Sequence, residues 1–389
     1  MSEAASGAPV PTAEELVAEA RARAGPATGP VVPFVANLER LLASCRRHAG
    51  LDARGIDVLR RVAVRHLRNL LAVEAHLAAA GPPDAGAAAA PPALVVTGIP
   101  RTGTTLVHNL LALDPGHRVL RLWEALRPAP PASRPPDGEL VAQAEAWIEA
   151  FRALAPGLAT IHPLAPEGPE ECDALLQNTF ASQHFEDMFA APGYSAWLAE
   201  APLHAEYRHY VAQLALLAGE GPPPRWALKS PSHLGHLDGL RQALPGATVV
   251  WCHRHPAEAV ASYASLVHAL RRAYSPGATP AEAGRHALER AAATVGRALA
   301  QRDAWGEESF ADVAYPDLEA RPAAAMAGLY KRLGRAVPSG QARAMDAWVA
   351  EHPRSGRHHY DLGRFGLTAA EVDAAFADYL DRFGHLVRG

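Results

Sequence analysis

The pattern of apolar and polar positions predicts a chain in which strands alternate with helices. Short apolar runs that end at Gly, Pro or a polar residue are typical of strands buried in a parallel sheet. Five such runs occur, at residues 94–96, 118–123, 225–229, 247–253 and 310–315. Apolar residues at helical spacing separate them, as in βαβ units. We therefore expect an α/β fold in which about five mostly parallel strands form a sheet flanked by helices.

The N-terminal part of the chain predicts a helical extension outside this sheet. Thr12 and Glu15 have the spacing of a capping box at the start of a first helix. Further apolar residues repeat at helical spacing, until the Pro-, Gly- and Ala-rich residues 81–92 predict a connector. The chain is thus expected to comprise an extension over residues 1–90 and a second domain over residues 91–389.

The first strand is followed by a turn suited to binding an anion. Residues Gly98 to Thr105 read GIPRTGTT and lead into a helix. A strand, a turn and a helix N-terminus in this order direct backbone N–H groups and the helix dipole at one point, where phosphate is stabilised. The spacing matches the nucleoside triphosphate cradle G-x-x-x-x-G-K-[ST], except that Thr104 replaces the lysine and the positive charge lies at Arg101. This difference predicts a different anion.

A second anion site is predicted where the strand at 247–253 ends. Arg254 follows this strand, Pro256 and Glu258 open a helix, and Ser262 lies eight residues beyond Arg254. An arginine fork and a serine hydroxyl can together bind one dianion. A triphosphate-dependent kinase has no use for a second phosphate site so far from its cradle.

These two sites resemble those of the sulfotransferase family, whose donor is 3′-phosphoadenosine-5′-phosphosulfate (PAPS). PRTGTT is similar to the PRSGTT form of tyrosylprotein and many bacterial small-molecule sulfotransferases, RHPAEAVASY to the family's 3′-phosphate segment, and AYPDLEARP to the segment whose tyrosine reaches the adenine. The resemblance runs from about residue 93 to 389 and implies a P-loop NTPase-like fold. It implies that the 5′-phosphosulfate is bound by Arg101, Thr102, Gly103, Thr104 and Thr105, the 3′-phosphate by Arg254 and Ser262, and the adenine by Tyr315.

The resemblance also implies which residues catalyse sulfuryl transfer. Lys229 ends the strand at 225–229, where tyrosylprotein sulfotransferases place a lysine at the transferring group, together with the cradle residue Arg101. Glu124 is similar in placement to their carboxylate base, although the intervening segment is two residues longer here. His233, four residues after Lys229, is the competing base, because cytosolic members use a histidine soon after a strand-end lysine.

Three residues between these candidates have both a functional and a structural interpretation. His162, Glu170 and Glu171 are candidates to line the acceptor pocket. Glu170 and Glu171 also suit the first turn of a helix that is predicted to begin at Pro169, where carboxylates interact well with the helix dipole.

The segment from Gly356 to Val372 also resembles the bacterial branch of the family. Arg354 lies just before this segment and Arg357 lies at its start. These two arginines either close over the 3′-phosphate or are solvated. The sequence leaves both interpretations open.

Composition and the cysteine pattern narrow the class of protein and its ligands. A net charge of −4 gives no general reason to expect nucleic acid, and 49% hydrophobic with 20% charged residues is typical of a globular protein. The three cysteines have spacings that fit neither a disulfide framework nor a metal site, so we expect free thiols in a reducing cytoplasm and no metal. No basic leader and no run near about eighteen apolar residues occurs, which predicts a protein that is neither exported nor membrane-spanning. None of these patterns specifies an oligomeric state.

The sequence therefore predicts a cytoplasmic sulfotransferase that uses PAPS, releases 3′-phosphoadenosine-5′-phosphate (PAP) and acts on a small-molecule acceptor, preferably an apolar one. The Pro-rich loop after Glu124 and residues 139–224 are expected to shape the acceptor pocket. Two alternatives remain, a P-loop small-molecule kinase that uses ATP and a non-catalytic nucleotide-binding protein. The missing cradle lysine disfavours the first, and the presence of both Lys229 and Glu124 disfavours the second.

Overall fold

Four parallel strands form the centre of the molecule. The computed structural model describes residues 9–24, 29–30, 34–80, 93–129, 137–154, 164–219, 225–352 and 361–387. Within them, β1 (Leu94–Thr97), β2 (Ala227–Lys229), β3 (Thr248–His253) and β4 (Phe310–Ala314) form one sheet in the order β2-β1-β3-β4. All neighbouring pairs are parallel, with Val96 opposite Lys229 and Thr97 opposite Trp251. The carboxyl ends of the strands therefore meet at one edge, which is where ligands of such sheets bind.

The prediction of a strand at residues 118–123 is wrong, because these residues form no regular strand. Arg118 forms a single parallel bridge to Trp226 beside β2, and the chain then turns into the short helix α5 (Leu122–Leu126). The cause is local, because the Arg121 N–H donates to the Glu124 carboxylate and thereby caps the start of this helix. The sheet consequently has four strands in the described residues, and the predicted α/β architecture with a parallel sheet flanked by helices is otherwise confirmed.

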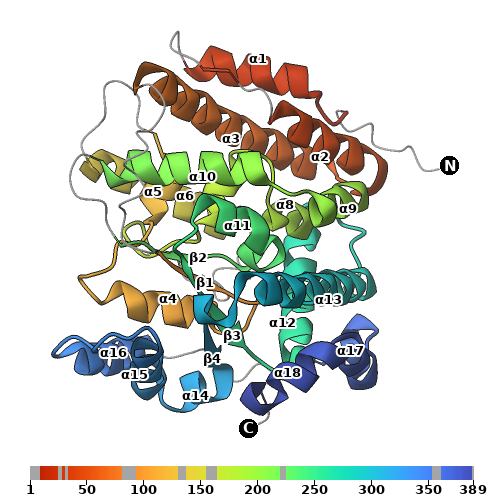
Figure 1. The fold of residues 1–389 in the computed structure, drawn as a ribbon. Coiled ribbons are helices and arrows are strands. Elements are labelled where there is room, and N and C mark those ends of the chain that lie inside the picture. Colours follow the sequence, from red (N-terminus) through yellow and green to blue (C-terminus); the bar gives the residue numbers. More distant parts are fainter. Residues whose placement is uncertain are drawn as a thin grey trace.

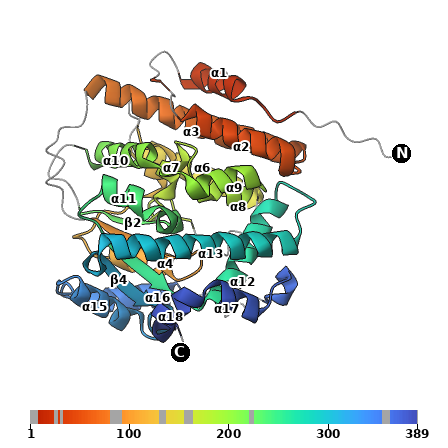
Figure 2. The same cartoon turned by 45° about the vertical axis from the view of Figure 1, so that its right-hand side comes forward.

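Helices cover both faces of the sheet, because successive strand residues point to opposite sides. Val95, Val249 and Trp251 belong to the larger hydrophobic cluster, whereas Val96 and Val250 belong to a second one. The first face is covered by α7 (Asp173–Gln177), α8 (Gln183–Met188), α9 (Pro192–Glu200), α10 (His204–Ala218), the 3-10 helix η2 (Pro231–His236), α11 (Leu237–Ala243), α12 (Pro256–Arg272), α13 (Pro280–Trp305), α17 (Ala369–Ala375) and α18 (Ala377–Val387). The second face is covered by α4 (Thr104–Ala112), α14 (Tyr315–Ala320), α15 (Pro322–Arg332) and α16 (Gln341–Glu351), which Figure 1 places on the side away from the N-terminal helices. Figure 2 shows the same for α15 and α16.

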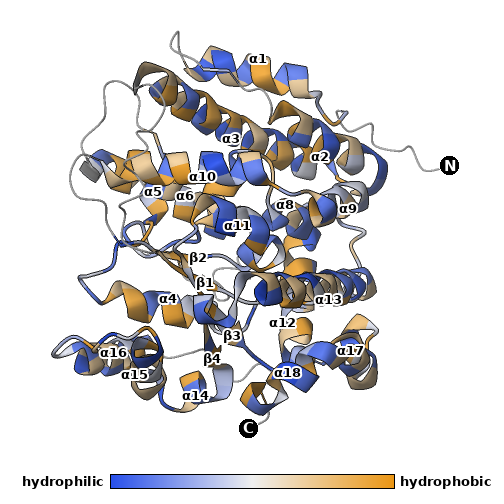
Figure 3. Cartoon of the chain, viewed as in Figure 1, coloured by the Kyte–Doolittle hydropathy of each residue, from blue (hydrophilic) through white to orange (hydrophobic). Residues whose placement is uncertain are grey.

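The N-terminal extension consists of α1 (Ala13–Ala24), α2 (Val35–His48) and α3 (Ala53–Ala80), which lie together at one end of the molecule (Figure 1). The predicted capping box is confirmed, since the Thr12 N–H donates to Glu15 Oε2 over 2.8 Å and the Glu15 N–H donates to Thr12 Oγ1 over 3.2 Å. Hydrophobic and hydrophilic residues alternate around these helices (Figure 3). Their buried side chains, such as Leu67, join the same hydrophobic cluster as the first face of the sheet.

The remaining elements and the cysteines bear on further predictions. Helix α6 (Asp137–Leu154) covers the helix predicted at residues 139–154, and it packs on α5. The 3-10 helices η3 (Glu307–Ser309) and η4 (Gly363–Phe365) complete the regular elements. Cys45, Cys172 and Cys252 are buried free thiols. No helix in the described ranges has the length and apolar character needed to cross a membrane.

Candidate active site

The turn after β1 has the backbone geometry of an anion cradle, which we define as residues 98–105. A methyl group on Gly98 would lie 2.6 Å from Thr102 Oγ1 and 2.7 Å from the carbonyl oxygen of Cys252, so only glycine fits between β1 and β3. Thr102 Oγ1 donates to the carbonyl oxygen of Ile99 over 2.9 Å and fixes the turn from inside. Gly103 has a φ of +91° and precedes α4, whose first N–H groups open towards the turn.

Arg101 adopts a left-handed backbone conformation at the tip of this cradle. Its φ of +75° is uncommon for a residue with a side chain, and such strain is typical of functional sites. Arg101 Nε donates to Ser262 Oγ over 3.1 Å, and Arg254 Nη1 donates to the Arg101 carbonyl oxygen over 3.0 Å. The two anion sites predicted from distant segments therefore adjoin each other at the carboxyl edge of the sheet.

Tyr315 lies against both of these sites. It begins α14 directly after β4, and the Arg254 guanidinium carbon lies 4.2 Å from the centre of its ring. A methyl group on Gly103 would lie 2.9 Å from Tyr315 Cδ2, so the absent side chain at Gly103 lets the ring approach the cradle. Arg101, Gly103, Arg254, Ser262 and Tyr315 are thus brought together from three strand ends and two helices.

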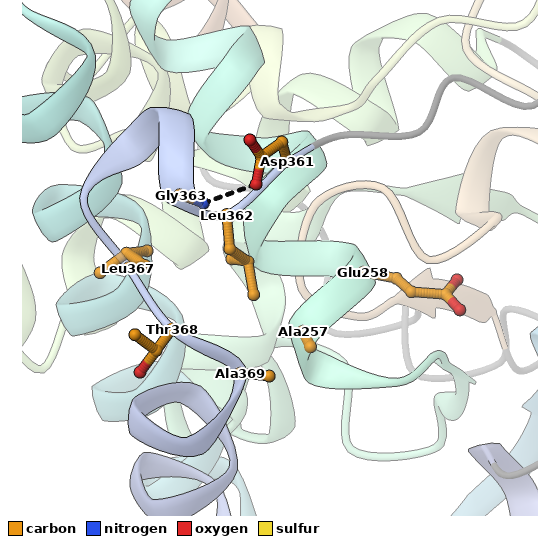
Figure 4. Close-up of a pocket in the computed structure, with 8 residues that line it drawn as sticks. All are labelled: Ala257, Glu258, Asp361, Leu362, Gly363, Leu367, Thr368 and Ala369. Atoms are coloured by element: carbon orange, nitrogen blue, oxygen red, sulfur yellow. Dashed lines mark hydrogen bonds between the residues drawn. The ribbon is translucent and has the colours of Figure 1, made fainter.

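A cavity of about 430 Å³ lies between the start of α12 and residues 361–369 (Figure 4). Glu258 on α12 lines the cavity, and its carboxylate accepts from Arg254 Nε over 3.0 Å. Asp361 and Leu362 approach from the opposite wall, where Asp361 accepts the Gly363 N–H over 2.8 Å. The other lining residues are Ala257, Leu367, Thr368 and Ala369.

Lys229 ends β2 and is buried at the same edge. Its side chain is only 2% exposed, and its ammonium group forms an ion pair with the Glu171 carboxylate and donates to Thr105 Oγ1 over 3.3 Å. His108 lies close by, 3.1 Å from the Ala227 carbonyl oxygen, and burial and the neighbouring Lys229 charge lower its pKa to about 4. At neutral pH this histidine is uncharged, so Lys229 supplies the positive charge next to the start of α4.

The segment that carries Glu171 is a loop, which corrects the helix start predicted at Pro169. The Glu170 N–H donates to the Leu120 carbonyl oxygen over 2.8 Å, and the Cys172 N–H donates to the Lys229 carbonyl oxygen over 3.0 Å. Helix α7 begins only afterwards, at Asp173. The helix-dipole interpretation of Glu171 is therefore replaced by a direct contact with Lys229, which sequence reasoning missed.

Glu124 lies in the first turn of α5 and is almost fully buried. Arg118 Nη1 donates to Glu124 Oε2 over 3.0 Å, Arg118 Nη2 contacts the other carboxylate oxygen, and the Arg121 N–H donates to Oε2 over 2.9 Å. Arg118 was not identified from the sequence as a partner of Glu124, although the two residues are only six positions apart on one short segment. The carboxylate is thus engaged by an arginine fork and by a helix cap.

His233 lies in the core on η2 and has partners at both ring nitrogens. Its Nδ1 is 2.9 Å from the Tyr207 hydroxyl and its Nε2 is 3.2 Å from Cys172 Sγ. Burial lowers its pKa to about 3, so the ring is neutral at ordinary pH. These contacts favour a structural role over that of a base. The remaining candidates, His162, Arg354 and Arg357, lie outside the described residues.

The fold and the turn define an α/β protein with a cradle-shaped turn at the carboxyl edge of its parallel sheet. The model of the sulfotransferase family matches residues 92–339, and the chain belongs to this family. Among curated proteins a sequence search found no match. In the described residues no group of three or more His, Cys, Asp or Glu side chains is arranged to hold a metal ion.

Two solved structures are similar over nearly the whole chain. Sulfotransferase STF1 from Mycobacterium tuberculosis H37Rv is 30% identical with a TM-score of 0.81, over 95% of this chain and 99% of that one. Sulfotransferase STF9 from Mycobacterium avium is 27% identical with a TM-score of 0.82, over 96% of each chain. The N-terminal extension therefore lies within the region that these sulfotransferases share with this chain, and the resemblance inferred from PRTGTT and RHPAEAVASY is confirmed.

Proposed function

We propose that this protein transfers a sulfuryl group from PAPS to a hydroxyl or amine of a small, predominantly apolar acceptor. One observation carries the proposal. A cradle that lacks the lysine of nucleoside triphosphate enzymes lies next to a second cation and hydroxyl, Arg254 and Ser262, in a member of the sulfotransferase family. Two adjoining anion sites suit a nucleotide with charged groups at both its 5′ and 3′ positions.

The donor's parts are assigned to the residues that adjoin at the sheet edge. The 5′-phosphosulfate would be bound by the cradle residues Arg101 to Thr105, through backbone N–H groups and the Arg101 guanidinium. The 3′-phosphate would be bound by Arg254 and Ser262, and the adenine would lie against Tyr315. Such a donor would replace the contact that Arg101 now makes with Ser262. Transfer of the sulfuryl group would convert the donor into PAP.

The chemistry needs a cation at the reacting group and a base. Negative charge develops on the bridging oxygen as the sulfur–oxygen bond breaks, and Lys229 would stabilise it. The contact of its ammonium group with the first turn of α4 supports this role. The acceptor proton must pass to a base within hydrogen-bonding reach. The family resemblance gives Glu124 this role. The reaction as proposed has no step that requires a metal, and we propose the cytoplasm as its compartment.

Calorimetric titration with PAP, ATP and 5′-AMP tests the donor assignment. The wild type is expected to bind PAP more tightly than 5′-AMP, because only PAP has a 3′-phosphate. Arg254→Ala should remove most of this difference, by about 10-fold to 100-fold in Kd, since a hydrogen bond to a charged group contributes about 1.5–3 kcal/mol. Arg61→Ala is the matched control, because Arg61 is an exposed arginine on α3 that pairs with Asp57.

Two results would reject the proposal. Equal affinity for 5′-AMP and PAP would remove the 3′-phosphate site. A preference for ATP in the presence of Mg²⁺ would favour the kinase alternative instead.

A further inference from the structure

We propose that Glu171, and not Glu124, is the carboxylate that takes the proton from the acceptor, and that it becomes basic only when the donor has bound. This inference rests on the proposed sulfuryl transfer. It concerns the ion pair between Glu171 and Lys229, which joins the loop before α7 to the end of β2.

The position of Glu171 relative to Lys229 is the first argument. In an in-line transfer the attacking oxygen lies near the sulfur, and the base lies within hydrogen-bonding reach of that oxygen. A carboxylate that contacts Lys229, the cation proposed to stabilise the transferred group, therefore lies close to where the attacking oxygen must be. Glu171 has this contact. The hydrogen bonds of Glu124 instead go to Arg118 and to the backbone of Arg121, on its own short segment.

The exposure of the two side chains gives the direction from which the acceptor arrives. The Lys229 side chain is 2% exposed, whereas the Glu171 side chain is 31% exposed. The ammonium group thus faces the cradle and the start of α4, and the carboxylate lies on the side of the pair that solvent reaches. An acceptor hydroxyl that approaches from solvent meets Glu171 before it meets Lys229.

The backbone around Glu171 is held in a way that fixes this arrangement. The Cys172 N–H donates to the Lys229 carbonyl oxygen over 3.0 Å, and Cys172 Sγ lies 3.2 Å from the same oxygen. His233 Nε2 contacts this thiol, and its Nδ1 contacts the Tyr207 hydroxyl. This series of side-chain contacts, from Tyr207 through His233 to Cys172, therefore anchors the loop to the end of β2. We assign these three as positioning residues.

The charges around Glu171 explain how donor binding would activate it. Lys229 is an adjacent cation and Glu170 an adjacent carboxylate, and the buried His108, His233 and Cys172 are neutral at ordinary pH. In the protein without donor, the Lys229 ammonium group is paired with the Glu171 carboxylate. When the sulfonate oxygens approach Lys229, they compete for the ammonium group and bring negative charge towards Glu171, which raises its affinity for a proton.

The transfer step balances with these residues alone. The acceptor oxygen forms a bond to sulfur while the bond between sulfur and the 5′-phosphate oxygen breaks. The acceptor proton moves to the Glu171 carboxylate. The electron pair of the broken bond stays on the phosphate oxygen of PAP, where the cradle and Lys229 stabilise it. The proton leaves Glu171 to solvent after the products have gone.

Proton uptake on donor binding is a test that does not require the natural acceptor. PAPS is titrated by calorimetry in two buffers of different ionisation enthalpy, between about pH 5 and 7, a range that brackets a carboxylate with raised proton affinity. The wild type is expected to take up more protons than Glu171→Gln, and Glu171→Gln should bind PAPS at least as tightly because a nearby negative charge is gone. Glu167→Gln is the matched control, since Glu167 lies in the same loop and its side chain is 67% exposed.

Single-turnover conversion of ³⁵S-labelled PAPS, with water and with 2-naphthol as acceptors, supplies the second measurement. Glu171→Gln is expected to lower the transfer rate by about 10²-fold to 10⁴-fold, the usual contribution of a general base. Glu124→Gln is measured in parallel, once thermal denaturation has shown that this variant is folded, because Glu124 is the base that the family resemblance implies.

The outcomes separate this inference from the proposed function. If the wild type binds PAPS but Glu171→Gln takes up the same number of protons, or transfers within about tenfold of the wild type, Glu171 is not the base and the sulfotransferase proposal stands. A large loss in Glu124→Gln with little change in Glu171→Gln would return the role to Glu124. If the wild type binds neither PAPS nor PAP, both proposals fall.

Discussion

Lys229 Nζ donates to Thr105 Oγ1 over 3.3 Å, so the end of β2 is joined to the first turn of the helix that follows the cradle. This hydrogen bond links two segments that are 124 residues apart in the chain. It places the only cation of β2 next to the N-terminus of α4, where an anion is stabilised by the helix dipole and by backbone N–H groups. A charged group bound in the cradle would meet the lysine and the helix end at the same time.

Lys229→Met is expected to separate catalysis from donor binding. Methionine fills a similar volume without the charge, so transfer should fall by about 10²-fold to 10³-fold while the Kd for PAP changes by a few-fold only. Single-turnover conversion of PAPS and calorimetry with PAP measure the two effects. Lys331→Met is the control, because Lys331 is the only other lysine of the chain and lies exposed on α15. Equal effects of both substitutions on transfer would contradict the role of Lys229.

Arg101→Gly should have opposite effects on stability and on donor binding. Glycine adopts the left-handed conformation of this residue without strain, so the free energy of unfolding should stay within about 1 kcal/mol of wild type or rise. The loss of the guanidinium should weaken PAPS binding. Arg101→Ala keeps the backbone strain and loses the charge, so it should weaken binding equally and unfold at a lower denaturant concentration than Arg101→Gly. Chemical denaturation and calorimetry provide the comparison.

The parts of this site that could be predicted from the sequence are those set by local order along the chain. A strand, a turn with Gly98 and a helix follow one another within twenty residues, and the Arg254 junction has the same simple order. Because parallel strands end at one edge, these local patterns predict neighbours in space. The structure places Arg101, Arg254 and Ser262 together accordingly.

The parts that could not be predicted depend on contacts between distant segments. Glu171 and Lys229 are 58 residues apart, and they meet where the Cys172 N–H bonds to the end of β2. The spacing of His233 from Lys229 suggested a base, but Tyr207 and Cys172, from other elements, enclose its ring. The apolar run at 118–123 looked like a strand because composition does not reveal that Glu124 caps a helix there.

Gly98→Ala is expected to disrupt the cradle. The added methyl group would lie 2.6 Å from Thr102 Oγ1 and 2.7 Å from the Cys252 carbonyl oxygen, and neither the backbone of β3 nor the turn can move away without losing hydrogen bonds. Overpacking of this kind costs about 1–3 kcal/mol, and PAP binding should weaken with it. Gly296→Ala on α13 is the control, since no atom lies within 4 Å of the added methyl group and alanine favours a helix by about 0.5–1 kcal/mol. A stable Gly98→Ala protein with unchanged PAP binding would contradict the model of the turn.

Stability at acid pH should depend on Asp312 at the middle of β4. Burial alone would raise the pKa of this carboxyl, but hydrogen bonds from Arg302 and His253 outweigh burial and hold the pKa below its ordinary value. A carboxyl whose pKa is lower in the folded protein stabilises it above the unfolded pKa of about 3.9, and this contribution is lost as the pH falls through the folded pKa. His253 acts in the same direction, because burial lowers its pKa and the neutral ring must take up a proton in acid.

Denaturant unfolding of wild type and Asp312→Asn between about pH 3 and 7 tests this dependence. Asp312→Asn should be less stable than wild type by about 2–4 kcal/mol at pH 7, because Arg302 is buried and loses one of its two carboxylate partners. The difference should shrink as the pH falls towards 3, where the wild-type carboxyl begins to lose its advantage. Asp303→Asn is the control, because Asp303 is 65% exposed and its pair with Arg382 should contribute at most about 1 kcal/mol. If the stability difference for Asp312→Asn were the same at pH 3 as at pH 7, the lowered pKa of Asp312 could not be a source of acid sensitivity in this protein.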